Sequence, residues 1–174
     1  MAAENTERGE LDYLFSITYE ELRRLASTVR RGDPSATLNP TALVNEAWLK
    51  LANSRHVATT SRLHFKRIAA RAMRQVLVEA ARRRHADKRG GEGARFITLD
   101  EGLPEIACEE ELIGLDSALD ELAQVQPRQA MMVESRFFGG LEIAEIAELL
   151  EVSEATILRD WRAAKAWLAH TLRQ

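Results

Sequence analysis

Basic side chains are concentrated in one part of the chain, between residues 62 and 95. This stretch contains eleven basic and three acidic residues, a net charge of +8, whereas the whole chain carries −3. Guanidinium and ammonium groups gathered in this way bind nucleic-acid phosphates, and a local excess indicates such a surface better than the overall charge does. The densest part, Arg82, Arg83 and Arg84, would also suit a solvated helix end, because cations there favour the helix dipole.

Residue types that support catalysis or metal binding do not form a site. A single cysteine, Cys108, excludes an internal disulfide and a cysteine-rich zinc site, and the four histidines lack metal-ligand spacing. There is no Ser/His/Asp order, no glycine-rich phosphate loop and no convincing carboxylate pair. We therefore expect a protein that is not an enzyme and that needs no cofactor or metal.

The first half of the chain must position the basic stretch, and its apolar residues recur at helical spacing. They predict helices over about 11–29, 41–51 and 62–84. Asn39 and Pro40 suit the start of the second helix, since asparagine caps free N–H groups and proline fits the first turn. Ser61 is expected to cap the third helix. We find no convincing strand, so the expected fold is all-α.

A break in periodicity separates two helical regions. Three glycines at 90, 91 and 93 interrupt the pattern, which stays weak up to the acidic run Glu109, Glu110 and Glu111. We expect residues 90–111 to be a flexible linker, with the acidic run solvated. The prediction is therefore two small helical domains, over residues 8–89 and 112–174.

The second domain contains the pattern of a helix-turn-helix between residues 142 and 157. Ala147 is small where two helices would cross, Ser153 would cap the second helix, and Glu151 stands in the turn where glycine is usual. An ordinary pair of packed helices is the alternative. The second helix of this motif enters the DNA major groove. Its candidate exposed residues are Glu154, Thr156, Arg159 and Arg162, with Lys165 behind them on phosphate.

Membrane association is not expected. No apolar run approaches the roughly 20 residues that a membrane span needs. The first residues lack the apolar centre of a signal peptide. We expect a cytoplasmic protein.

Taken together, the segments resemble the extracytoplasmic-function (ECF) group of bacterial sigma factors of the sigma-70 type. The resemblance extends from about residue 11 to residue 172. Residues 43–51 are similar to the family helix that begins Leu-Val-Gln-Glu, residues 65–84 to the helix that melts and reads the −10 promoter element, and the helix-turn-helix to the module that reads the −35 element. Residues 156–162 and 88–91 look like a subgroup associated with Ser/Thr kinases.

The resemblance implies a sigma factor that directs RNA polymerase core to promoters, contacting the core at its clamp and flap regions. Asn45 and Glu46 match the polymerase-binding motif. A stand-alone helix-turn-helix regulator is the alternative, but it would leave the basic first domain without a role. The candidate cations for the −10 element are Arg71, Arg74, Arg82, Arg83 and Arg84.

Two departures from the family pattern bear on regulation and specificity. Relatives usually carry acidic residues where this chain has Asn39 to Ala42, and often a basic residue where it has Asp160. The missing acids suggest that a Ser/Thr kinase switches the protein on, although an inhibitory anti-sigma protein is another form of control. Thr41 could equally be an ordinary first-turn residue, and Ser61 only a cap. The candidate phosphorylation sites are Thr41, Thr59, Thr60 and Ser61.

Overall fold

The computed structural model describes residues 2–29, 39–53, 61–87 and 109–173. In these parts of the chain it contains seven α-helices and no strand, which confirms the all-α prediction. No helix among them is both long enough and apolar enough to cross a membrane. The helices are α1 (Ala2–Val29), α2 (Pro40–Ala52), α3 (Arg62–Asp87), α4 (Glu109–Val125), α5 (Pro127–Gly139), α6 (Ile143–Leu149) and α7 (Glu154–Thr171).

The helix starts follow the caps that the sequence predicts. The side chains of Asn39, Ser61 and Ser153 each accept a hydrogen bond from the backbone N–H three residues later, at 2.7, 3.1 and 3.2 Å. These bonds satisfy N–H groups that have no partner within the helix. At the end of α5, Gly140 adopts the left-handed conformation (φ 63°) that stops a helix.

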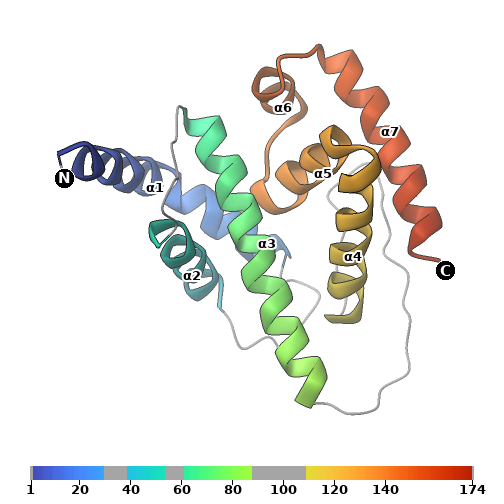
Figure 1. The fold of residues 1–174 in the computed structure, drawn as a ribbon, viewed down its shortest axis with the longest axis horizontal. Helices are drawn as coiled ribbons and strands as arrows, with labels where there is room; N and C mark the ends of the chain where they lie inside the picture. The colour runs from blue at the N-terminus through green and yellow to red at the C-terminus, as the bar shows by residue number, and fades with distance from the viewer. Residues whose placement is uncertain (1, 30–38, 54–60, 88–108, 174) are drawn as a thin grey trace.

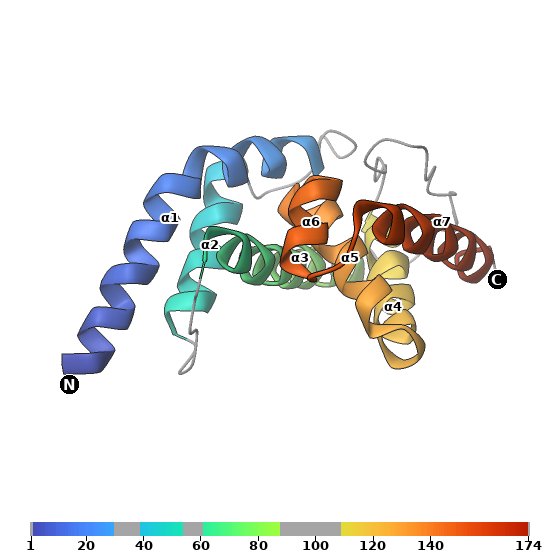
Figure 2. The same ribbon diagram turned by 90° about the horizontal axis from the view of Figure 1, so that it is seen from above.

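Helix α3 runs through the middle of the molecule (Figure 1). Helices α1 and α2 pack on one side of it, and α4 and α5 pack on the other. Seen from above, α1 and α7 lie at opposite ends of the molecule (Figure 2). The central helix of the first domain is therefore also the surface that the second domain covers.

The hydrophobic core is continuous across the two helical regions. Buried side chains of α3 and of α5, among them Phe65, Met73 and Phe138, belong to one cluster. The backbones approach closely at Gly139, where a Cβ atom would lie only 2.9 Å from the Cβ of Ala70 in α3. The two predicted domains thus pack against each other through a shared apolar interface.

The acidic run at the start of the second region differs from expectation. Glu109, Glu110 and Glu111 form the first turn of α4 and do not extend the linker. Glu109 and Glu111 are buried, and the Glu109 carboxylate lies 2.5 Å from Nε of Arg84. The expectation of a solvated run was wrong for Glu109 and Glu111, because the basic end of α3 packs against the start of α4, whereas Glu110 is exposed. The rest of the predicted linker, residues 90–108, lies outside the described residues.

Candidate nucleic-acid interface

Helices α6 and α7 follow each other across a short turn, an arrangement compatible with the predicted helix-turn-helix. The turn between them is closed by a hydrogen bond from the Val152 N–H to the Ala147 carbonyl, at 3.0 Å. Glu151 has a φ of 53°, the left-handed conformation for which glycine is the usual residue. For a side-chain-bearing residue this conformation costs roughly 1–2 kcal/mol. Ile146 and Ile157 are fully buried beneath the turn, as expected for the small core.

The outer face of α7 presents most of the residues that the sequence nominates for base contacts. Glu154, Arg159 and Arg162 are exposed, and Lys165 is half-buried. The opposite face packs into the domain. Its buried residues are Ile157, Asp160, Trp161, Ala164 and Leu168.

Sequence reasoning missed Leu158, whose side chain is 42% exposed on the outer face of α7. A leucine suggests a position in the core, but the helical spacing of Leu158 from its charged neighbours does not. Leu158 is four residues after Glu154 and four before Arg162, and residues four apart lie on the same face of a helix. An apolar side chain therefore stands among the charged ones at the candidate groove-facing surface.

Thr156 takes part in the cap of α7 instead of projecting outward. Its N–H donates to Ser153 Oγ, and its hydroxyl oxygen lies 3.0 Å from the same atom. The side chain is half-buried. Both polar groups of Thr156 therefore have a local partner, which distinguishes it from the other nominated residues of α7.

Asp160 is buried, with 5% of its surface exposed, and forms an ion pair with Arg128 of α5. Its Oδ2 accepts a hydrogen bond from Arg128 Nε at 2.8 Å, and Arg128 Nη2 lies 2.7 Å from the same oxygen. A cation–π contact also joins these two helices: the Arg136 guanidinium lies 5.3 Å from the centre of the Trp161 ring. Asp160 thus fixes α7 to α5 and does not face outward.

The α3 cations nominated for DNA divide into two groups. Arg71 and Arg83 are exposed. Arg82 pairs with Asp116 of α4 at 2.8 Å although its side chain is 57% exposed, and Arg84 pairs with Glu109 of α4. The second group therefore faces the second domain.

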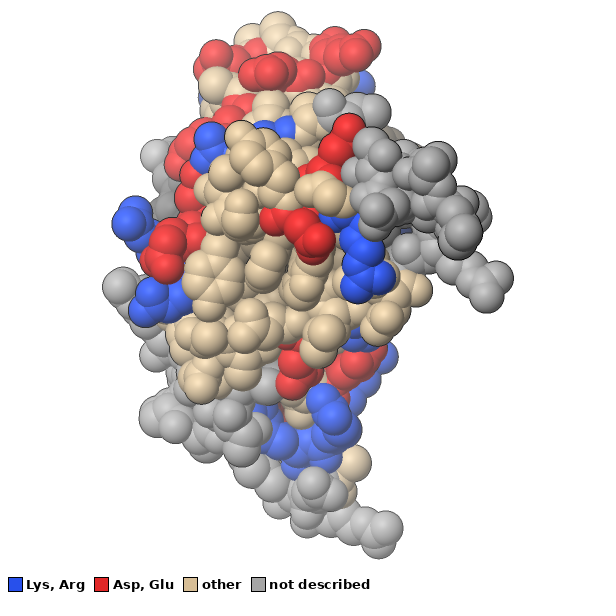
Figure 3. Space-filling view, turned by 90° about the vertical axis from the view of Figure 1, so that its left-hand side faces the viewer, with Lys and Arg blue, Asp and Glu red and all other residues tan. Residues whose placement is uncertain are grey.

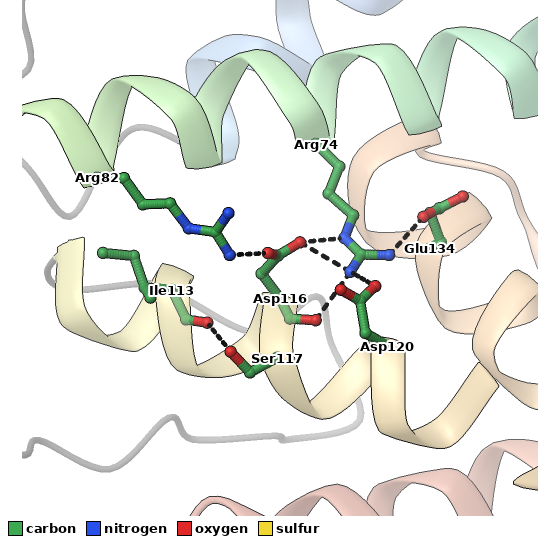
Figure 4. Close-up of polar contacts among 7 residues, drawn as sticks. All are labelled: Arg74, Arg82, Ile113, Asp116, Ser117, Asp120 and Glu134. Carbon is green, nitrogen blue, oxygen red and sulfur yellow. Dashed lines mark hydrogen bonds and ion pairs between the residues drawn. The ribbon is translucent and has the colours of Figure 1, made fainter. Parts of the chain in front are cut away.

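Arg74 has the most extensive contacts of the set (Figure 4). Its guanidinium donates to Asp116 at 2.8 Å, to Asp120 at 2.6 Å and to Glu134 at 2.8 Å. Its side chain is 12% exposed. Burial by itself lowers the pKa of Arg74, but the hydrogen bond to Glu134 and the charge of Asp116 outweigh it and raise the pKa. The charged guanidinium is thus held by carboxylates from both α4 and α5.

Helix α2 presents a stripe of exposed residues at four-residue spacing. Thr41, Asn45 and Leu49 are exposed, and Glu46 is half-buried. Leu49 is 58% exposed, large for an apolar side chain. The face that α1 and α2 present is mostly uncharged, with acidic residues gathered above it and basic residues below it (Figure 3). The stripe on α2 has the mixed apolar and polar character of a protein-binding surface.

The remaining nominated residues precede α3 in the sequence. Ser61 is exposed and its hydroxyl oxygen caps the helix. Thr59 and Thr60 lie outside the described residues.

Comparison with known proteins adds one match. A family model described as ECF sigma factor matches residues 3–174, nearly the whole chain. No curated protein and no solved structure matches this chain.

Proposed function

The chain belongs to the ECF sigma factor family, and we propose that three of its helix faces each make one of the contacts that promoter recognition requires. A sigma factor directs transcription by binding RNA polymerase core and promoter DNA. In our proposal α7 reads the −35 element, α3 engages the −10 element and α2 contacts the polymerase clamp. The observation that carries the proposal is the helix-turn-helix with its outward α7 face, in a chain matched over its length by one family.

The −35 contacts come from the outer face of α7. Arginine donates two hydrogen bonds to the edge of guanine, and an apolar side chain contacts the methyl group of thymine. Arg159 and Arg162 suit the first contact, and Leu158 suits the second. Glu154 can accept from the amino group of cytosine, and Lys165 reaches phosphate.

The polymerase contact comes from the exposed stripe of α2. Asn45 and Glu46 offer polar groups, and Leu49 offers an apolar anchor of the kind that dominates the centre of protein interfaces. The flap region of the core would hold the second domain. A stand-alone regulator would need none of these polymerase contacts, so binding to core discriminates between the two functions.

Substitutions on α7 test this division. Arg159→Ala and Arg162→Ala should each reduce promoter use by the equivalent of about 1–3 kcal/mol and leave core binding unchanged. Arg173→Ala, an exposed arginine after the end of α7, is the matched control and should have little effect. Equal loss of core binding in the two α7 variants would show that this helix faces protein and would contradict the assignment.

We further propose that phosphorylation of Thr41 strengthens the polymerase contact. Thr41 is exposed in the first turn of α2, and that turn contains no acidic residue. A phosphate would add about −1.5 to −2 charges at a helix N-terminus, where the dipole favours negative charge. It could then form charge-assisted hydrogen bonds with arginines of the core. An inhibitory anti-sigma protein is the alternative form of control.

The test compares core binding and transcription in cells for Thr41→Ala and Thr41→Glu. Thr41→Ala should abolish activation, and Thr41→Glu should restore part of it, since a carboxylate supplies part of the charge. A triple alanine change at Thr59, Thr60 and Ser61 asks whether the second patch is the modified one instead. Tight core binding by the unmodified protein, with no effect of any change, would rule the switch out.

A further inference from the structure

A cleft on the surface of the molecule lies between α3, α4 and α5. Its volume is about 510 Å³, within the range of roughly 300–1,000 Å³ that is usual for small-molecule sites. Both charged and apolar side chains line it. The cleft is therefore large enough for a ligand the size of a nucleotide, and the chemistry of its lining indicates which kind of ligand it suits.

Four arginines of α3 line the cleft, and they form two groups. Arg74 and Arg82 are paired with carboxylates of the neighbouring helices (Figure 4). Among the residues that the structure describes, no carboxylate forms an ion pair with Arg67 or Arg71. One part of the cleft is thus neutralised, and the other part presents two guanidinium groups without a countercharge from the described residues.

The surroundings of Arg67 favour an added anion. Arg67 is half-buried, and its guanidinium lies 3.2 Å from Nε2 of His64 and 3.9 Å from the sulfur of Met131. Burial and the charge of Arg67 lower the pKa of His64, so both of these contacts are with neutral groups at pH 7. Arg71 follows one helical turn later, and like charges at this spacing repel each other. A bound anion would relieve this repulsion and supply the missing countercharge.

We propose that the cleft binds a nucleoside diphosphate, with its phosphates between Arg67 and Arg71 and its base against the apolar side chains of α4 and α5. Arginine binds phosphate oxygens through charge-assisted hydrogen bonds, and two guanidinium groups suit two neighbouring phosphates. This inference goes beyond the proposed function, which assigns no small ligand to the protein.

The rest of the lining favours a nucleotide over inorganic phosphate. Ala123 and Pro127 are exposed, Met131 is half-buried, and all three line the cleft. Because Met131 contacts Arg67, an apolar surface begins beside the phosphate position, and a thioether packs well against an aromatic ring. Asp120, which is 70% exposed and also lines the cleft, can accept hydrogen bonds from ribose hydroxyls. Inorganic phosphate would use the arginines and none of these groups.

Occupation of the site affects one contact of the proposed function. Arg71 is assigned there to the −10 element, so a phosphate bound to Arg71 would keep this guanidinium from DNA. Added GDP should therefore weaken binding of a single-stranded −10 oligonucleotide by the wild type and have no effect on Arg67→Ala. This consequence rests on the proposed function, whereas nucleotide binding by itself does not.

Isothermal titration calorimetry on the full chain, in magnesium-free buffer, tests the site with GDP, ADP, pyrophosphate and guanosine. The two nucleotides should bind at least tenfold more tightly than pyrophosphate, and guanosine should not bind measurably. Arg67→Ala should weaken nucleotide binding at least tenfold. Arg83→Ala is the matched control, because Arg83 is an exposed arginine of α3 that does not line the cleft, and its effect should be less than twofold.

A second pair of variants changes the apolar side of the cleft. Met131→Glu places a carboxylate beside Arg67, where it would replace the phosphate, and should abolish nucleotide binding. Met131→Leu keeps an apolar side chain and should retain it. Circular dichroism shows that each variant is folded, and GDP should raise the Tm of the wild type and of Met131→Leu but not that of Met131→Glu, because a ligand that binds the native state stabilises it.

Three results would overturn the nucleotide site. These are no binding of either nucleotide to the wild type at about 1 mM, equal affinity for pyrophosphate and nucleotides, or unchanged binding by Arg67→Ala. If neither nucleotide binds while Arg67→Ala loses affinity for the oligonucleotide, the two arginines serve DNA alone. Each of these outcomes leaves the sigma function intact, whereas failure of the wild type to initiate with polymerase core would overturn the sigma function whatever the nucleotide result.

Discussion

The ion pair between Asp160 and Arg128 gives the sharpest test of how α7 is held. The two partners are buried unequally: Asp160 is 5% exposed, whereas the Arg128 side chain is 49% exposed. Removing the arginine leaves a carboxylate inside the domain without its partner. Removing the carboxylate charge leaves an arginine that can turn into water. The two substitutions should therefore have unequal costs.

The magnitudes follow from this asymmetry. Breaking a fully buried ion pair costs about 3–5 kcal/mol, and an exposed pair is worth about 0–1 kcal/mol. With one partner half-exposed, Arg128→Ala should lower the unfolding free energy by about 2 kcal/mol and Asp160→Asn by about 1 kcal/mol. For a chain of this length, Tm should fall by about 2–4 °C per kcal/mol.

Thermal unfolding followed by circular dichroism measures both effects, and binding to a panel of −35 sequences measures specificity. The double variant should be more stable than Arg128→Ala alone, since no unpaired carboxylate remains. None of the three variants should change which −35 sequence is preferred. A change of preference by Asp160→Asn with an unchanged Tm would mean that Asp160 faces DNA, and the reasoning would be refuted.

Three further predictions concern the same helices. At the turn before α7, Glu151→Val should lower the unfolding free energy by about 1–3 kcal/mol, because a β-branched residue tolerates a left-handed φ poorly; Glu151→Gly should not destabilise, and denaturant titration compares the two. Leu158→Ala should weaken binding only to −35 sequences that place a thymine methyl against it, and equal weakening for all sequences in a binding panel would argue against a base contact. Burial by itself raises the pKa of Glu145, but the hydrogen bond from the Glu142 N–H and the contact with Lys66 outweigh it and lower the pKa. The stabilisation is therefore present above the unfolded pKa of about 4.3 and lost as pH falls through the lower folded pKa, so the stability difference between wild type and Glu145→Gln should shrink on acidification, as unfolding at pH 6 and pH 3 would show.

Local signals explain what could be predicted from the sequence. The caps at Asn39, Ser61 and Ser153 depend on residues within one turn, and each is where the residue types placed it. The helix-turn-helix could be predicted because its small core is contiguous in sequence. Glu151 was picked out as an unusual turn residue, and it adopts the left-handed conformation.

Non-local contacts explain what could not be predicted. Glu109 looks solvated by composition, and its burial depends on Arg84, which precedes it by 25 residues and belongs to another helix. The basic charge of α3 was evident, but which of its arginines are paired depends on how α4 and α5 pack against it. The sequence analysis did not consider Leu158 and did not predict whether Asp160 is buried. Helical spacing from the buried Ile157 would have placed Asp160 inside and Leu158 outside.

The central claim is that the chain recognises promoters only together with polymerase core, and run-off transcription tests it most directly. The chain, core and both together are compared on a set of genomic fragments at physiological salt, with DNA binding by the chain alone measured in parallel. Because the chain is acidic overall, and because the proposed function divides its contacts between two small domains, we expect weak DNA binding by the chain alone. Together with core it should produce transcripts that start at discrete sites. Nanomolar binding by the chain alone, with no transcription gained by adding it to core, would contradict the claim.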